Sequence, residues 1–211
     1  MRAVVLEEQG GPEKLTIQRV AVPIPGPTDV LIKIQYCGVD GHDVAIRSGI
    51  RRLGFTPGMI PGHEMSGIVV AVGEQVSTLK LGDPVCNKTQ PSCGLCDLCR
   101  IGQESVCLNR TYTNVEGGLA EYAVCPEDCA VLVPDGVDMV NAAVAGCAVA
   151  TPLHAVAEVA QVRAGETVLV TGAGGGLGIH AIQLVRLFGA RVIALVVGQA
   201  VAKPEKSLEE P

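Results

Sequence analysis

Four cysteines crowd into fifteen residues of this 211-residue chain. The segment that holds them reads PSCGLCDLCRIGQESVC, so their spacing is C-x2-C-x2-C-x7-C. Two-residue gaps let a tight turn aim successive thiolates at one ion, and the fourth thiolate closes a tetrahedron that leaves no position for substrate. We therefore expect a structural zinc site that stabilises a loop with almost no apolar core of its own. Its predicted ligands are Cys93, Cys96, Cys99 and Cys107.

Two other interpretations of this cysteine cluster stay open. The four cysteines could instead form an oxidised or redox-labile group. They could also bind an iron–sulfur cluster, whose ligands have similar spacing. The concentration of all four cysteines in one polar excursion favours zinc over both. The chain has nine cysteines, and in an intracellular protein such a number calls for a reason other than disulfide bonds.

Composition and charge exclude several classes of function. Hydrophobic residues make up 48% of the chain and charged residues 18%, which is typical of globular proteins. The net charge of −6 argues against nucleic acid as a partner, because no basic stripe is present to neutralise phosphates. No apolar stretch reaches the roughly 18 residues of a membrane-spanning helix, and the N-terminus lacks the apolar core of a signal peptide. We expect a cytoplasmic protein that binds neither nucleic acid nor membranes.

The first 135 residues consist of short apolar segments separated by glycine- and proline-rich turns. This pattern predicts a compact β barrel or sandwich with long excursions. The expected strands are Arg2–Leu6, Leu15–Val20, Val30–Tyr36, Gly67–Val72, Pro84–Asn87, Leu119–Val124 and Ala130–Val133.

The pattern changes near Asp138, where an alanine-rich stretch predicts one or two helices broken near Thr151 and Pro152. After it come the apolar strand ETVLVTG, a glycine turn that enters an amphipathic helix in AGGGLGIHAIQLVRLFG, and a second apolar strand in ARVIALVV. A strand, glycine turn, helix and strand in about thirty residues predict one βαβ unit. The final residues, Gly198–Pro211, are polar and are expected to form a tail.

Several motifs occur together in a characteristic order. GVDGHD (38–43) and PGHEMSG (61–67) precede the four-cysteine segment, and GCAVAT (146–151) and the glycine-rich βαβ unit follow it. In order and spacing this set resembles the medium-chain zinc-dependent alcohol dehydrogenases, over residues 1 to about 197. In that family a GroES-like catalytic domain carries two zinc ions and a Rossmann domain binds NAD(P).

The resemblance implies a fold that combines the α+β and α/β classes. Residues 1–150 are expected to form the GroES-like β barrel with its zinc lobe. Residues 151–211 are expected to supply the first βαβ unit of a truncated Rossmann domain and the polar tail. Because members of the family are considerably longer, the chain is interpreted as a short form of such an enzyme.

The resemblance also implies a catalytic zinc. His63 matches the histidine ligand of the family's G-H-E motif, Cys147 matches the cysteine at the start of the linking helix, and Glu64 matches the carboxylate that can exchange onto the metal. The first ligand position departs from the family, because Asp40 replaces a cysteine. A carboxylate binds zinc at ~2.0–2.2 Å and makes the site harder, so Asp40 is an acceptable ligand. The alternative is that Asp40 is a solvated turn residue and the catalytic site is damaged.

His42 stands where the family commonly has the serine or threonine that begins a proton relay. An imidazole with a pKa near neutrality can do the same task, although an exposed histidine at a helix start is the other interpretation. The family's downstream relay histidine would fall at Ala45, so that step is missing. In the implied mechanism zinc polarises the substrate oxygen, the relay removes its proton, and hydride passes to the nicotinamide.

The glycine turn TGAGGGLG (171–178) follows a strand and opens a helix, which is the context of a dinucleotide-binding turn. Glycine permits close approach of a pyrophosphate, and the helix N-terminus offers amide hydrogens and a positive dipole end. No carboxylate follows the second strand at 195–198, so both NAD and NADP are retained as cofactors. The expected cofactor-binding residues of this turn are Gly172, Gly175, Gly176, Leu177 and Gly178. The resemblance also implies Thr151, which matches a family position near the nicotinamide.

The function expected from these motifs is hydride transfer between an alcohol, aldehyde or ketone and NAD(P). We expect the isolated chain to bind the structural zinc yet to turn over alcohol poorly, and a homo-oligomer is considered for the full-length form. The competing hypothesis is a non-catalytic zinc-binding fragment or regulator derived from the same fold. A zinc-free enoyl or quinone reductase is disfavoured by His63, Glu64 and Cys147.

Overall fold

The computed structural model describes residues 1–50, 54–109 and 115–197. The chain divides into two compact units, of residues 1–147 and from residue 148 onward, and each is described by itself. The predicted domain boundary at residue 150 stays a prediction. The predicted tail, Gly198–Pro211, lies outside the described residues.

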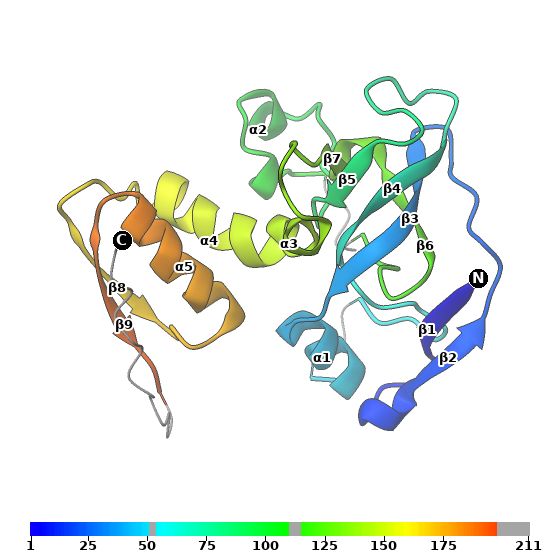
Figure 1. Cartoon of the computed structure of the whole chain (residues 1–211), viewed down its shortest axis with the longest axis horizontal. Helices are drawn as coiled ribbons and strands as arrows, with labels where there is room; N and C mark the ends of the chain where they lie inside the picture. The colour runs from blue at the N-terminus through cyan, green and yellow to red at the C-terminus, as the bar shows by residue number, and fades with distance from the viewer. Residues whose placement is uncertain (51–53, 110–114, 198–211) are drawn as a thin grey trace. The chain divides into compact units, whose positions relative to one another are not determined.

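The first unit is built on a curled antiparallel sheet with the strand order β6-β3-β4-β5-β7 (Figure 1). A separate antiparallel pair, β1 with β2, lies beside it and is joined to it through the segment 119–121. The strands are β1 (Arg2–Leu6), β2 (Leu15–Arg19), β3 (Asp29–Gly38), β4 (Glu64–Val72), β5 (Pro84–Asn87), β6 (Tyr122–Pro126) and β7 (Ala130–Leu132).

Two irregularities in the long strand β3 explain why the sheet curls. The pairing of β3 with β4 shifts register between Leu31 and Ile32 and again between Ile34 and Tyr36. Such bulges bend a strand and increase its twist. The curled sheet encloses an aliphatic core that includes Val30, Ile32, Met65, Val69 and Val85.

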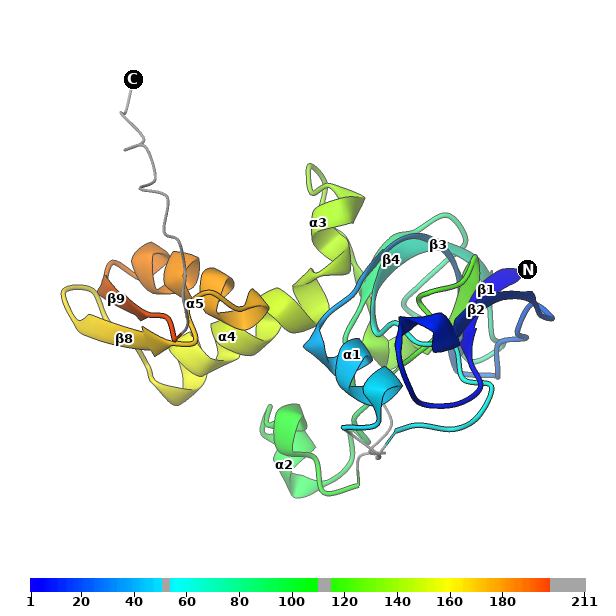
Figure 2. The same ribbon diagram turned by 90° about the horizontal axis from the view of Figure 1, so that it is seen from below.

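Short helices attach to this sheet. Helix α1 (Gly41–Ser48) follows β3 directly and begins at the capping residue Asp40. Helix α2 (Asp97–Arg100) lies in the four-cysteine segment, which stands off the sheet in both ribbon views (Figures 1 and 2). Helix α3 (Met139–Ala143) contacts β3, β4 and β5.

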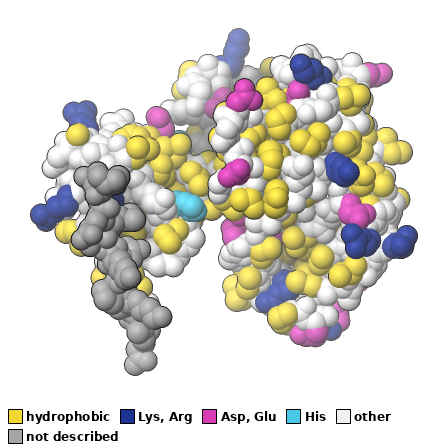
Figure 3. Space-filling view, viewed as in Figure 1, with side chains coloured by type: hydrophobic (Ala, Val, Ile, Leu, Met, Phe, Trp, Pro, Cys, Tyr) yellow, Lys and Arg dark blue, Asp and Glu magenta, His cyan; other side chains and the backbone are white. Residues whose placement is uncertain are grey.

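The second unit contains the predicted βαβ arrangement. Strands β8 (Thr167–Thr171) and β9 (Arg191–Leu195) pair in parallel, and helix α5 (Gly176–Leu187) connects them. The half-barrel of the first unit and this βαβ unit confirm the predicted fold class. In the described part of the chain, no helix is both long and apolar enough to cross a membrane. Lys and Arg side chains are spread singly over the face shown in Figure 3.

The predicted helix break at Thr151 and Pro152 is wrong. Helix α4 (Ala150–His154) passes through both residues, with π-helical turns before it (Ala145–Val149) and after it (Ala155–Val159). Pro152, which has no N–H to donate, lies where the hydrogen-bond pattern changes from the π-helical turn to α4.

Two strands begin three residues away from their predicted starts. Strand β4 begins at Glu64 rather than Gly67, because Glu64 and Met65 pair with the end of β3. Strand β6 begins at Tyr122 rather than Leu119, because the preceding residues turn toward β1: the N–H of Val4 donates to the carbonyl of Leu119 at 2.9 Å.

Candidate functional site

The four thiols of the cysteine lobe, which we define as residues 93–108, converge on one point. Sulfur–sulfur distances are 3.5 Å for Cys96–Cys99 and Cys93–Cys107, and 3.9 Å for Cys93–Cys99 and Cys96–Cys107. A tetrahedral zinc with Zn–S bonds of about 2.3 Å places its sulfurs about 3.8 Å apart. The residues present therefore fit a closed four-thiolate zinc site.

The lobe has little else to hold its shape. Leu95 is 82% exposed, Ile101 68% and Leu108 73%, so its large apolar side chains lie in solvent rather than in a core. Backbone amides of Leu95 and Cys96 lower the pKa of the Cys93 thiol to about 6, whereas burial and the neighbouring thiols raise the pKa of Cys99 to about 12. Because a metal binds thiolates, a bound ion must displace the proton that Cys99 holds at neutral pH.

A second group of metal-ligand side chains comes from three segments far apart in the sequence. One ligand atom from each of Asp40, His63 and Cys147 lies within 4.8 Å of the others. The Oδ2 atom of Asp40 is 3.7 Å from Nε2 of His63. Bonds of ~2.0–2.2 Å place two ligands of a tetrahedral zinc about 3.4 Å apart, so this set also fits a zinc ion.

Asp40 has two separate interactions through its two carboxylate oxygens. Oδ1 accepts hydrogen bonds from the backbone N–H groups of His42 at 2.7 Å and Asp43 at 3.3 Å, which caps helix α1. Oδ2 is directed to His63. The carboxylate of Asp43 completes a capping box by accepting from the Asp40 N–H at 3.1 Å. Asp40 is therefore a helix cap that still offers one oxygen to the ligand group.

His63 is buried, with a side chain only 2% exposed, and its surroundings hold it from both sides. Its Nδ1 lies 3.6 Å from Oδ1 of Asp43, which accepts a hydrogen bond from the Gly62 N–H. Nδ1 has no hydrogen-bond partner among the described residues. A histidine that ligates a metal through one nitrogen directs the other toward a carboxylate in this way.

The protonation of His63 follows from the same contacts. Burial lowers its pKa, but the carboxylate of Asp43 and the Cys147 side chain outweigh burial and raise it to about 10. The pKa of Asp43 is lowered: burial opposes the shift, and the His63 contact and backbone N–H donors outweigh it. In the metal-free chain at neutral pH, His63 is thus a cation between two carboxylates.

Asn87 positions both His63 and Cys147. Its buried Nδ2 donates to the carbonyl of His63 at 2.8 Å, and its Oδ1 accepts from the N–H of Met65 at 2.8 Å. A Cβ on Gly146 would lie 1.9 Å from the Asn87 carbonyl oxygen. Only glycine therefore permits the π-helical turn that carries Cys147 to approach the end of β5 so closely.

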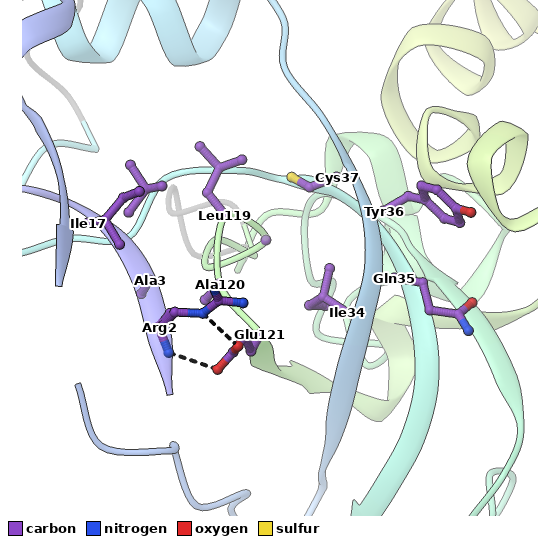
Figure 4. Close-up of a pocket in the computed structure, with 12 residues that line it drawn as sticks. Arg2, Ala3, Ile17, Ile34, Gln35, Tyr36, Cys37, Leu119, Ala120 and Glu121 are labelled. Atoms are coloured by element: carbon purple, nitrogen blue, oxygen red, sulfur yellow. Dashed lines mark hydrogen bonds and ion pairs between the residues drawn. The ribbon is translucent and has the colours of Figure 1, made fainter. Parts of the chain in front are cut away.

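Glu64 and Cys37 lie outside this group. Glu64 is buried at the start of β4 but does not share in the Asp40–His63–Cys147 grouping, so exchange of its carboxylate onto a metal stays a prediction. The thiol of Cys37 donates to the Gly38 carbonyl at 3.3 Å and lines a pocket of about 440 Å³ between β1 and β3 (Figure 4). Figure 4 also shows the Arg2–Glu121 ion pair in that pocket. Burial raises the pKa of Cys37 to about 12.

His42 lies against a residue that sequence analysis missed. Its Nε2 is 3.6 Å from Oε1 of Glu116, and its ring meets that of His63 edge-on with centroids 4.6 Å apart. Nothing in the local pattern around Glu116 marks it, because it is brought to His42 by the tertiary fold. The presence of a carboxylate just before the paired glycines Gly117 and Gly118 was the only available signal.

The glycine turn has the geometry of a strand-to-helix turn. Gly172 has φ of +65°, and a Cβ on Gly178 would lie 2.3 Å from the Gly172 carbonyl oxygen, so both positions require glycine. A Cβ on Gly176 would meet nothing within 4 Å. Gly175 caps helix α5, and Leu177 in its first turn is 49% exposed. Thr151 lies exposed in α4, and its role near a cofactor stays a prediction.

Comparisons with known proteins agree with these motifs. Residues 26–135 match the family described as "Alcohol dehydrogenase GroES-like domain". An alcohol dehydrogenase of Schizosaccharomyces pombe is 36% identical over 208 residues, which cover 97% of this chain and 59% of that protein. A quinone oxidoreductase of Sus scrofa is 37% identical over 194 residues, which cover 92% of this chain and 52% of that protein. The chain thus spans little more than half the length of these relatives.

A solved structure shows the same likeness in three dimensions. The cobalt- and zinc-bound thermostable alcohol dehydrogenase of Pyrobaculum aerophilum superposes with a TM-score of 0.84 at 34% identity, over 92% of this chain and 59% of that one. The curled sheet, the ordered motifs and these matches lead to one conclusion. The chain belongs to the medium-chain zinc-dependent alcohol dehydrogenase family.

Proposed function

We propose that this chain serves a zinc-dependent oxidoreductase reaction in which hydride passes between a small alcohol, aldehyde or ketone and NAD(P). The observation that carries the proposal is the convergence of Asp40, His63 and Cys147 from three distant segments. The oxidoreductase names of its relatives support the reaction class.

Each group of ligands has a different task in this proposal. The four lobe cysteines hold a structural zinc, which has no open position. Zinc held by Asp40, His63 and Cys147 supplies Lewis acidity to an alcohol or carbonyl oxygen. Asp43 keeps the His63 ring oriented through Nδ1, and the Asp40 carboxylate is held in place by its second role as the α1 cap.

The proton and the cofactor are handled by other residues of the chain. His42 takes the proton of the substrate hydroxyl in oxidation and returns it in reduction, and Oε1 of Glu116 lies 3.6 Å from its Nε2. At the glycine turn, the open space beside Gly176 and the N-terminal amides of α5 receive the pyrophosphate of NAD or NADP.

We expect turnover by the isolated chain to be slow. Strands β8 and β9 form only a two-stranded sheet, and Leu169 and Ile193 within them are 57% and 46% exposed. A two-stranded sheet of this kind is marginally stable in water. The test must therefore detect substrate binding as well as hydride transfer.

The experiment compares the native chain with His63→Gln. With zinc in the lobe and Co²⁺ at the second centre, alcohols, aldehydes and ketones of graded size should perturb the visible cobalt spectrum of the native chain and leave that of His63→Gln unchanged. Oxidation and reduction of each nicotinamide cofactor should exceed the His63→Gln background. A native chain that binds only the lobe ion and shows neither response contradicts the proposal and favours the non-catalytic zinc-binding alternative.

A further inference from the structure

A second set of metal-ligand side chains lies beside the proposed catalytic centre and shares His63 with it. One ligand atom from each of His42, His63 and Glu116 lies within 4.8 Å of the others. We propose that these three residues form a second position for a divalent metal ion, which shares His63 with the position formed by Asp40 and Cys147. The inference rests on the proposed function through this shared imidazole.

The spacing of the set is compatible with that of metal ligands. Nε2 of His42 and Oε1 of Glu116 are 3.6 Å apart, whereas N–H···O hydrogen bonds cluster near 2.9 Å. Two nitrogen or oxygen ligands of a tetrahedral zinc lie about 3.4 Å apart. The His42 and His63 rings meet edge-on at 64° between their planes, and one ligand atom of each lies within 4.8 Å of a carboxylate oxygen of Glu116.

Backbone hydrogen bonds fix two members of this set, His42 and His63, independently of an ion. His42 is the second residue of α1, and its N–H is held at 2.7 Å by the capping carboxylate of Asp40. His63 is held by the bond from Asn87 to its carbonyl. The side chains of His42 and Glu116 are 16% and 21% exposed. An ion can therefore reach them from solvent while both side chains stay mostly buried.

The two positions are alternatives for a single ion. Nδ1 of His63 faces the carboxylate of Asp43, which leaves Nε2 as its ligand atom. A neutral imidazole nitrogen has one lone pair and binds one ion. The ion therefore occupies either the Asp40 and Cys147 side of His63 or the side of His42 and Glu116.

The chemistry of the two positions differs by a thiolate. Two imidazoles and a carboxylate form a set that binds zinc and leaves a fourth position open. Without the soft Cys147 sulfur, this set accepts harder ions such as Co²⁺ and Mn²⁺ more readily than the thiolate set does. The second position thus retains an ion in the chain when the Cys147 thiolate is lost.

The test removes that thiolate and asks whether the ion stays. Co²⁺ is titrated into chains that carry zinc in the lobe only. The chains are the native chain, Cys147→Ala, Cys147→Ala with Glu116→Gln, and the matched control Cys147→Ala with Glu64→Gln. The number of cobalt ions bound per chain is measured after dialysis. Near-ultraviolet absorption reports any thiolate–cobalt bond, including one formed if cobalt replaces zinc in the cysteine lobe. Circular dichroism confirms that each variant is folded.

We expect the native chain to bind one cobalt with the thiolate band, and Cys147→Ala to bind one cobalt without it. Adding Glu116→Gln should weaken that binding by at least about tenfold, the scale on which metal sites respond to a lost partner. Adding Glu64→Gln should not. Loss of cobalt in Cys147→Ala, or weakening by Glu64→Gln but not by Glu116→Gln, overturns the inference. The absence of the thiolate band in the native chain contradicts the proposed catalytic set instead, so the two failures are distinguishable.

Discussion

The cysteine lobe and the Asp40–His63–Cys147 group bring metal ligands together in opposite ways. All four lobe ligands lie within residues 93–107 and converge where apolar side chains are exposed. The other group joins residues 40, 63 and 147, and a capped helix, a sheet register and a buried amide hold its members. The comparison teaches that the lobe should need its ion in order to fold, whereas the second group should be folded before its ion arrives.

The largest expected effect is on the lobe. Cys99→Ser removes a buried thiolate ligand from the four-cysteine site. In isolated zinc-binding peptides, the free energy of binding a structural zinc is about 10–16 kcal/mol. We expect one zinc per chain to be lost and residues 93–108 to become open to limited proteolysis. Zinc analysis and mass spectrometry of the fragments measure both. Cys86→Ser, a half-buried cysteine outside both groups, is the control and should change neither.

The second expected effect separates metal loss from unfolding. His63→Gln removes the ligand that both proposed positions share, so the chain should lose its second ion completely. Because Asn87 bonds to the backbone of residue 63 rather than to its ring, the sheet should remain intact. Zinc content and far-ultraviolet circular dichroism test these two expectations. If limited proteolysis cut His63→Gln within the cysteine lobe, the two groups would not be independent and the proposed distinction would be wrong.

The pH dependence of the metal-free chain should report His63. Its folded pKa of about 10 lies above the ordinary value of 6.5, so the folded chain binds more protons than the unfolded chain between these values. The stabilising contribution is complete below pH 6.5 and is lost as pH rises through 10. We expect the free energy of unfolding by urea to fall between pH 7 and pH 9.5 more in the native chain than in His63→Gln. Equal slopes would contradict the His63 assignment.

The smallest expected effect separates the two roles of Asp40. Asn caps helices about as well as Asp, so Asp40→Asn should leave thermal stability nearly unchanged. It should lower the affinity for the second ion by roughly 10–100-fold. Asp40→Ala should lose both functions, with about 1 kcal/mol of stability lost with the cap. Calorimetry of unfolding and zinc titration measure the two separately. If Asp40→Asn binds zinc like the native chain, Asp40 serves only as a cap.

The sequence predicted features that depend on neighbouring residues better than those that depend on distant ones. The cysteine spacing, the glycine turn and the βαβ unit follow from local patterns, and the sheet strands were placed to within a few residues. Family motifs suggested His63 and Cys147, but not Glu116, because its approach to His42 depends on the path of the segment before Gly117. The sequence could not show that Asp40 both caps helix α1 and faces His63, because helix capping and metal ligation each favour a carboxylate at that position.

The helix through Pro152 shows a different limit. Proline and the residue before it usually mark a helix boundary, which led to the predicted break. In the structure the helical backbone continues from the π-helical turn Ala145–Val149 into α4, so Pro152 lies within a helical segment. The residues around a proline do not reveal such a change of hydrogen-bond pattern, so the sequence alone indicated a break.

The most direct test of two independent metal centres in one chain is the zinc content of the purified native protein beside that of His63→Gln. After loosely bound ions are removed, we predict two zinc ions per native chain and one per His63→Gln chain. One zinc in both proteins would contradict the account, because it would leave the lobe as the sole centre.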